Sequence, residues 1–155
     1  MEQFLDQRSR RFQSGGWNVA GSRLLAVASW IAKQNLLRVK RKFADIDVFL
    51  VFVLVSLAIK FVSSSLIVML LVSLSVSYVV KKLLTKLYLE DILETLSRDT
   101  QKLLVLQLMD YCESKNIDPE SISDLSRALL DEKISDRIQE ILLKFVSEET
   151  KFFAI

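Results

Sequence analysis

Apolar and polar positions divide the chain into three parts with different spacing. Between Trp17 and Ile31, apolar residues recur at every third or fourth position, the spacing of one helical face. From Ile46 to Val80 they are almost continuous, and after position 80 the helical spacing returns. With only 3 Gly and 1 Pro, the chain has few of the residues that hairpin turns and sheets need. The pattern therefore predicts an all-α protein.

The apolar stretch from Ile46 to Val80 is too long for one membrane-spanning helix. Asp47 and Lys60 are its only charged residues, and as a single helix it would measure about 52 Å, against about 30 Å of bilayer hydrocarbon. We expect a break at 63–65, three consecutive serines whose hydroxyls can bond to freed backbone groups. The prediction is a membrane-inserted, wedge-like helical hairpin over 46–80, with two short arms and a turn near 63–65.

Both flanks of this stretch are basic, which favours a hairpin with its two ends on the cytoplasmic side of the membrane. Lysines and arginines are concentrated in residues 38–42 before the stretch and in residues 81–86 after it. Two alternatives stay open. In one, Phe61–Val80 is a single span that starts after Lys60; in the other, the stretch is a buried helical pair in a soluble protein.

The segment before the apolar stretch is expected to lie on the membrane surface. Residues 1–16 are predicted to form a flexible polar N-terminus without the apolar core of a signal peptide, and residues 17–44 a basic amphipathic interfacial helix. The alternatives are that its apolar stripe packs against other helices, or that it forms an extra membrane hairpin, against which Arg23 and Lys33 argue. The predicted membrane-binding residues are Trp17, Leu24, Trp30, Ile31, Arg38, Lys40, Arg41 and Lys42.

Residues 81–155 are predicted to form an acidic soluble module of three helices. Nine basic and two acidic residues precede position 45, whereas eight basic and fifteen acidic residues follow Leu89. A long helix is expected over 81–115, a short one ending near Asp131, and a last one with apolar residues at helical spacing from Ile134. Asp118 before Pro119 is a start signal for the short helix, and Ser121 offers a second one.

The composition removes most catalytic and metal-binding chemistry. The chain has no His and one Cys, which excludes disulfide frameworks, His/Cys zinc sites and His-assisted nucleophiles. Cys112 lies between acidic neighbours that are expected to raise its pKa, so we interpret it as a core or boundary residue. We expect no enzyme activity and no cofactor or metal.

The C-terminus holds the one candidate recognition motif. Phe152 and Ile155 follow acidic residues and resemble the peptide that docks on ubiquitin-like autophagy modifiers by adding a strand. Phe153 and Ile155 before a free carboxylate also resemble a PDZ ligand. The alternative is that this tail closes the apolar face of the last helix.

A short hairpin between basic flanks is similar in layout to reticulon-type membrane-shaping proteins, without a residue motif in common. The resemblance implies a non-enzymatic protein of the endoplasmic reticulum or a related organelle that shapes or marks the bilayer. Its expected partners are anionic headgroups, proteins that bind residues 81–155, and a further copy of the chain, but not nucleic acid. The alternative is a membrane anchor or adaptor, or a small subunit of a membrane complex, without shaping activity.

Overall fold

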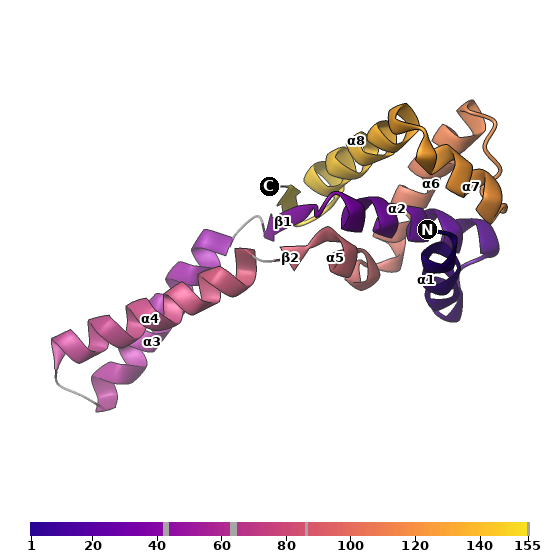
Figure 1. Cartoon of the computed structure of the whole chain (residues 1–155). Coiled ribbons are helices and arrows are strands. Elements are labelled where there is room, and N and C mark those ends of the chain that lie inside the picture. Colours follow the sequence, from indigo (N-terminus) through magenta and orange to yellow (C-terminus); the bar gives the residue numbers. More distant parts are fainter. Residues whose placement is uncertain (42–43, 63–64, 86, 155) are drawn as a thin grey trace.

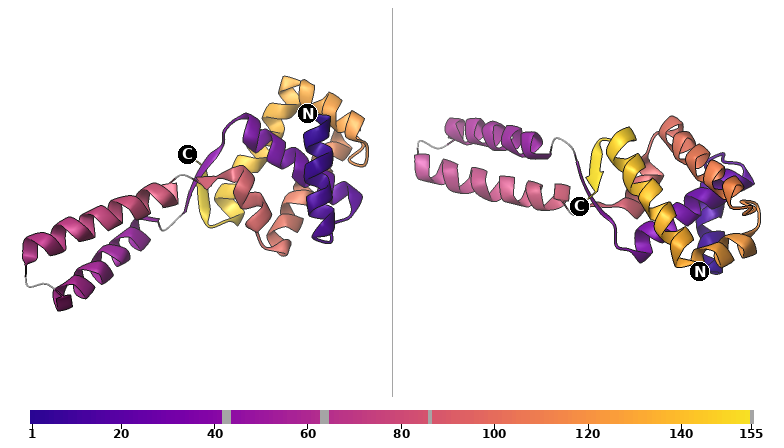
Figure 2. Two further views of the ribbon diagram at one scale, coloured as in Figure 1. Left: turned by 60° about the horizontal axis from the view of Figure 1, so that its bottom comes forward. Right: turned by 90° about the horizontal axis from the view of Figure 1, so that it is seen from above.

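The computed structural model describes residues 1–41, 44–62, 65–85 and 87–154. They form a helical domain and a two-helix hairpin that projects from one side of it, as Figures 1 and 2 show. Helices make up most of these residues, which confirms the all-α class. The hairpin consists of α3 (Ala44–Val62) and α4 (Leu66–Thr85). The helices of the domain are α1 (Glu2–Ser14), α2 (Val19–Gln34), α5 (Leu89–Thr95), α6 (Arg98–Ser114), α7 (Ile122–Leu130) and α8 (Glu132–Glu149).

Helix α2 lies at the centre of the domain, and this corrects the predicted interfacial helix over 17–44. It contacts α1, α5, α6 and α8, and the side chains of Leu24 and Ile31 are each only 1% exposed. Trp17 and Trp30 are partly buried against the same core. The helical spacing of apolar residues had suggested a face that contacts lipid. In the structure, other helices cover this face, and an apolar stripe can pack against either lipid or protein.

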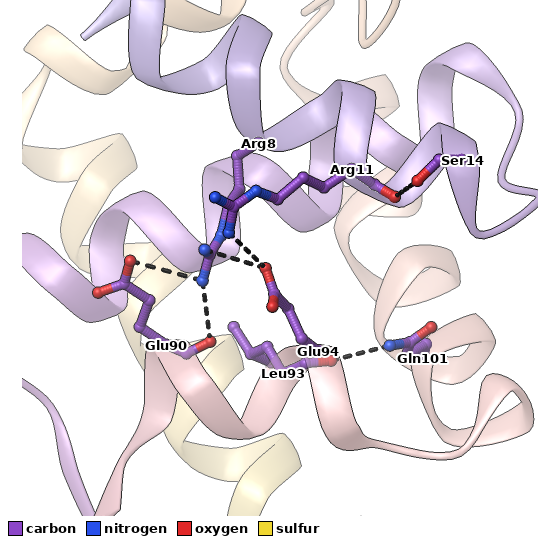
Figure 3. A network of polar contacts seen from close by, with 7 residues as sticks. All are labelled: Arg8, Arg11, Ser14, Glu90, Leu93, Glu94 and Gln101. Carbon is purple, nitrogen blue, oxygen red and sulfur yellow. Dashed lines mark hydrogen bonds and ion pairs between the residues drawn. The ribbon is translucent and has the colours of Figure 1, made fainter.

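Helix α1 replaces the flexible N-terminus predicted for residues 1–16. Leu5, Ser9 and Phe12 are buried on its inner face. Arg8, with a side chain 12% exposed, forms ion pairs with Glu94 at 2.9 Å and Glu90 at 3.5 Å on α5, as Figure 3 shows. Helix α1 is thus held mainly by packing against α2, and Arg8 adds ion pairs to α5.

The long helix predicted over 81–115 is divided into three. Helix α4 ends at Thr85, and α5 ends before Leu96, whose backbone is extended. Ser97 then caps α6 by accepting a hydrogen bond from the Thr100 amide at 3.3 Å. The short helix α7 begins after Ser121, which accepts from the Asp124 amide, rather than after Asp118. The described residues after 86 therefore contribute four helices to the domain, where three were predicted.

Three short strands of the described chain join the domain to the hairpin, a feature that the predicted all-helical chain lacked. They are β1 (Arg38–Arg41), β2 (Leu87–Tyr88) and β3 (Phe152–Ala154), in the order β2-β1-β3 and antiparallel throughout. Val39 in the central strand is fully buried. The sheet fixes the two ends of the hairpin beside each other, since β1 leads toward α3 and β2 follows α4.

The domain combines two segments that the hairpin separates in sequence. Residues 2–41 and 87–154 share one hydrophobic core, which includes Leu25 from α2, Leu93 from α5, Leu104 from α6 and Leu142 from α8. The N-terminus lies on the domain away from the hairpin, whereas the C-terminal strand β3 lies near the hairpin base (Figures 1 and 2). Residues 81–155 are thus not an independent module, because α2 supplies the centre of their core.

Candidate membrane-inserting hairpin

The hairpin exposes apolar side chains along its whole length. Phe61 and Val62, at the end of α3 distant from the domain, are 91% and 89% exposed. Exposed apolar side chains continue from there to the base of both helices, and soluble monomers rarely expose large contiguous apolar patches of this kind. The other exposed large apolar residues of the hairpin are Ile46, Phe49, Leu50, Leu54, Leu57, Leu66, Ile67, Val68, Leu70, Leu71, Val72, Leu74, Tyr78, Val79 and Leu83.

Serines occupy the contact between the two hairpin helices. Among the described residues of α3 and α4, those that are buried are Ser73 and Ser77. The Ser56 hydroxyl donates to the Ser73 hydroxyl at 2.9 Å. Small side chains let helices approach closely, and hydroxyls can hydrogen-bond between them. Buried serines therefore lie between the two helices, while the most exposed positions of the hairpin carry large apolar side chains.

Charged side chains surround the base of the hairpin. Lys40 Nζ lies 3.0 Å from Asp45 Oδ2, and an Arg41 nitrogen lies 3.6 Å from Asp47 Oδ2. Arg38 on the same strand stacks over the Tyr88 ring, 5.7 Å from its centroid. These ion pairs connect β1 to the first turn of α3. Charged side chains therefore lie at the base of the hairpin, and the exposed apolar surface extends from there toward its far end.

Helix α4 has the length and composition of a membrane span. Leu66–Leu83 is the one stretch of the described chain that meets both conditions, and only 11% of it is buried. Helix α3 has a similar length but carries Asp45, Asp47 and Lys60. The exposed surface of α4 distinguishes it from the core helices of the domain, of which α2 is the example.

The predicted membrane-binding residues separate into two groups in the structure. Arg38, Lys40 and Arg41 lie on β1 at the hairpin base, and Lys42 falls outside the described residues. The other four belong to the domain: Trp17, Leu24, Trp30 and Ile31. The Trp17 indole N–H donates to Gln101 Oε1 at 3.0 Å, and Trp30 packs on Phe4 with ring centroids 5.3 Å apart.

The outward-facing residues of the hairpin were not singled out from the sequence. Phe49, Leu54, Phe61 and Leu71 are each more than half exposed. An uninterrupted apolar run gives no signal for which residues face inward, because a helical stripe needs polar positions to define it. The serines at 56, 73 and 77 were the available signal, since 56 and 73 meet across the two helices. Of the predicted turn residues 63–65, Ser63 and Ser64 lie outside the described part of the chain.

The C-terminal tail forms a strand within its own chain. In β3, Phe152 pairs with Arg41 and Phe153 with Lys40 of β1, and Phe152 packs against the core of the domain. Ile155 and the side chain of Phe153 lie outside the described residues. The strand addition that the tail motif predicted for a partner protein is thus used here to attach the tail to the hairpin base.

Cys112 has the environment of a core residue. Its thiol is buried, and burial raises its pKa to about 11. The acidic neighbours named in the sequence are not the cause, since desolvation accounts for the shift. Over the described residues, no three His, Cys, Asp or Glu side chains are grouped as metal ligands would be.

Comparisons of the chain with protein-family models, with curated proteins and with solved structures give no match.

Proposed function

We propose that the hairpin inserts into a lipid bilayer and anchors the helical domain at the membrane surface, as a non-enzymatic membrane protein. The observation that carries this proposal is the distribution of side chains on α3 and α4. Serines are buried between the helices, and large apolar side chains cover the outside. Exposing this apolar surface to water costs a free energy of about 25 cal/mol per Å². Contact with lipid tails avoids this cost.

The shared core supports a hairpin with both ends on one side of the membrane. Residues 2–41 and 87–154 pack together, and β1 pairs with β2 directly beneath the two helices. A single span over Phe61–Val80 would put these two segments on opposite sides and separate α2 from α5, α6 and α8. The basic residues Arg38, Lys40 and Arg41 at the base favour the cytoplasmic face for the domain.

Anchoring is better supported than membrane shaping. Two predicted features could contribute to shaping by inserting into one leaflet: the hairpin over 46–80 and the interfacial helix over 17–44. The second is buried in the domain, so shaping would depend on the hairpin alone. The proposed location is the endoplasmic reticulum or a related organelle, and the domain is proposed to bind a protein partner through the segment 81–155.

Flotation with liposomes tests the anchor. The purified chain, transferred from detergent to vesicles of phosphatidylcholine and phosphatidylserine, is expected to float with the lipid and to resist extraction by high salt and alkaline carbonate. The variant Leu54→Arg/Leu71→Arg places two charges on outward positions of the hairpin and should lose most of its flotation, because each arginine near the bilayer centre costs about 2.5–3.5 kcal/mol.

The matched control is Leu106→Arg, which changes a residue 57% exposed on α6 and should float like the unchanged chain. Circular dichroism of all three proteins verifies that the helices remain folded. A chain that stays monodisperse in buffer without detergent and does not float would reject the anchor and favour a hairpin covered by another protein or by a second copy.

A further inference from the structure

The dimensions of the hairpin indicate how deeply it inserts. Helices α3 and α4 contain 19 and 20 residues, which correspond to about 28 and 30 Å along their axes. The hydrocarbon layer of a bilayer is about 30 Å thick. Exposed apolar residues continue from Ile46 near the base to Val62 at the far end. A wedge confined to one leaflet would cover only about half of this surface and leave the rest in water.

Lys60 adds a second observation. It is exposed, and it lies in the last turn of α3, two residues before the helix ends at Val62. The 13 positions from Asp47 to Lys60 correspond to about 20 Å of rise. Asp47 pairs with Arg41 at the base, so Lys60 stands near the opposite end of the hairpin.

The position of this charge distinguishes a wedge from a full crossing. If the tip stopped at the bilayer centre, the Lys60 ammonium would lie about 15 Å from either headgroup layer, at a cost of about 2.5–3.5 kcal/mol or more. If the tip reaches the other side, the same group meets lipid phosphates, which are strong acceptors for an ammonium donor. Lysines near helix ends extend to the interface in this way.

We infer that the hairpin crosses the entire hydrocarbon layer and that Lys60 binds the phosphate oxygens of lipid headgroups in the leaflet opposite the domain. This inference rests on the proposed anchor, and it replaces the short wedge expected from the sequence. The apolar run of α3 between Asp47 and Lys60, 48–59, spans only about 18 Å. The surrounding bilayer is therefore expected to thin around the hairpin rather than to bend.

Side-specific labelling of a cysteine at the tip tests the crossing. The full chain with Cys112→Ala and Ser65→Cys is inserted from outside into phosphatidylcholine vesicles that contain a membrane-impermeant maleimide. Because the domain is too large and polar to cross, it stays outside. We expect the introduced tip thiol to be labelled by the trapped reagent and protected from the same reagent added outside. The control Asp99→Cys, at a side chain 96% exposed on α6, should show the opposite result.

The role of Lys60 is tested in the same system. Lys60→Leu in the Ser65→Cys chain should reduce labelling from inside several-fold while flotation persists, and Lys60→Arg should restore it. Equal labelling of the Leu variant and the unchanged lysine would overturn the phosphate contact.

The other outcomes separate this inference from the anchor. Flotation with the tip thiol protected from both sides would overturn the crossing and leave the anchor as a wedge. If the reagent added outside labels the tip thiol and the chain does not float with the vesicles, both the anchor and the crossing are overturned.

Discussion

Leu24 shows that the environment of one side chain, rather than its type, separates a core face from a membrane face. Leu24 is 1% exposed between the helices of the domain, whereas Leu54 on the hairpin is 64% exposed. Both leucines lie on apolar helices. Transfer from water favours burial of either, whether the neighbours are side chains or lipid tails.

Replacement of Leu24 by alanine is therefore expected to destabilise the fold without weakening membrane binding. The cavity should lower the free energy of unfolding by about 2–5 kcal/mol, measured by chemical denaturation of the chain in mild detergent. Leu106→Ala on the exposed face of α6 is the control, with an expected change within about 0.5 kcal/mol. If the Leu24 variant instead floated less and its stability were unchanged, the result would support the interfacial helix predicted over 17–44.

Cys112 gives a prediction with a pH dependence. Its folded pKa of about 11 lies above the ordinary thiol pKa of 9.0, so the folded state holds the proton more tightly than the unfolded state. Its contribution to stability is present below pH 9 and is lost as the pH rises toward 11, by about 1–2 kcal/mol. Denaturation series at pH 8, 9 and 10.5 should show a steeper decline for the native chain than for Cys112→Ala. Parallel declines would contradict the assignment.

At the scale of elements, ion pairs connect α1 to α5, in addition to the packing of α1 against α2. Arg8 joins α1 to α5 through Glu90 and Glu94 and also donates to the Glu90 carbonyl at 3.4 Å. The network of Figure 3 continues to Leu93, whose carbonyl accepts from the buried Gln101 side chain at 2.8 Å. The α1–α5 contact thus reaches the N-terminal part of α6.

Arg8→Ala is expected to lower the free energy of unfolding by about 1–3 kcal/mol, because it leaves two carboxylates without their partly buried partner. Arg10→Ala is the matched control: Arg10 is 75% exposed and pairs with Asp6 on its own helix, so its loss should cost about 0.5 kcal/mol or less. Hydrogen exchange should show faster opening of α1 in the Arg8 variant alone. Equal effects of the two substitutions would show that the pairs to α5 do not hold α1.

At the scale of the whole molecule, the hairpin is an insertion into a domain that the remaining chain completes. Its two ends are fixed by the β1–β2 pairing of Arg38 with Tyr88 and Val39 with Leu87. Over the described part of the chain, no core residue of the domain comes from α3 or α4. The domain therefore has the contacts that it needs without the hairpin.

Two deletions test this architecture. Replacement of residues 44–85 by a short glycine-serine linker should give a soluble, monomeric domain with a cooperative thermal transition. The fragment 87–155 should remain largely unfolded, because it lacks the buried residues of α2 such as Leu24, Leu25 and Ile31. Circular dichroism and size-exclusion chromatography of both proteins measure the outcome. If the fragment 87–155 folded by itself, the result would support the independent module predicted from the sequence over 81–155.

Local patterns in the sequence were sufficient for the helical class and for the two-part apolar stretch between the basic flanks. Helical spacing, the scarcity of Gly and Pro and the length of the apolar run depend only on neighbouring residues. The same patterns did not reveal α1, whose buried residues Leu5 and Phe12 are too few to define a stripe, or the end of α4 at Thr85.

Only the tertiary structure decided which surface each apolar face meets. The stripe of α2 is covered by α1, α5, α6 and α8, while the faces of α3 and α4 are open. The tail at Phe152 pairs with β1, more than one hundred residues earlier in the chain. The spacing of apolar residues shows that a helix face is apolar, but it does not show what covers that face. Protein and lipid both exclude water from it. The partner of each face depends on contacts between residues that are distant in sequence.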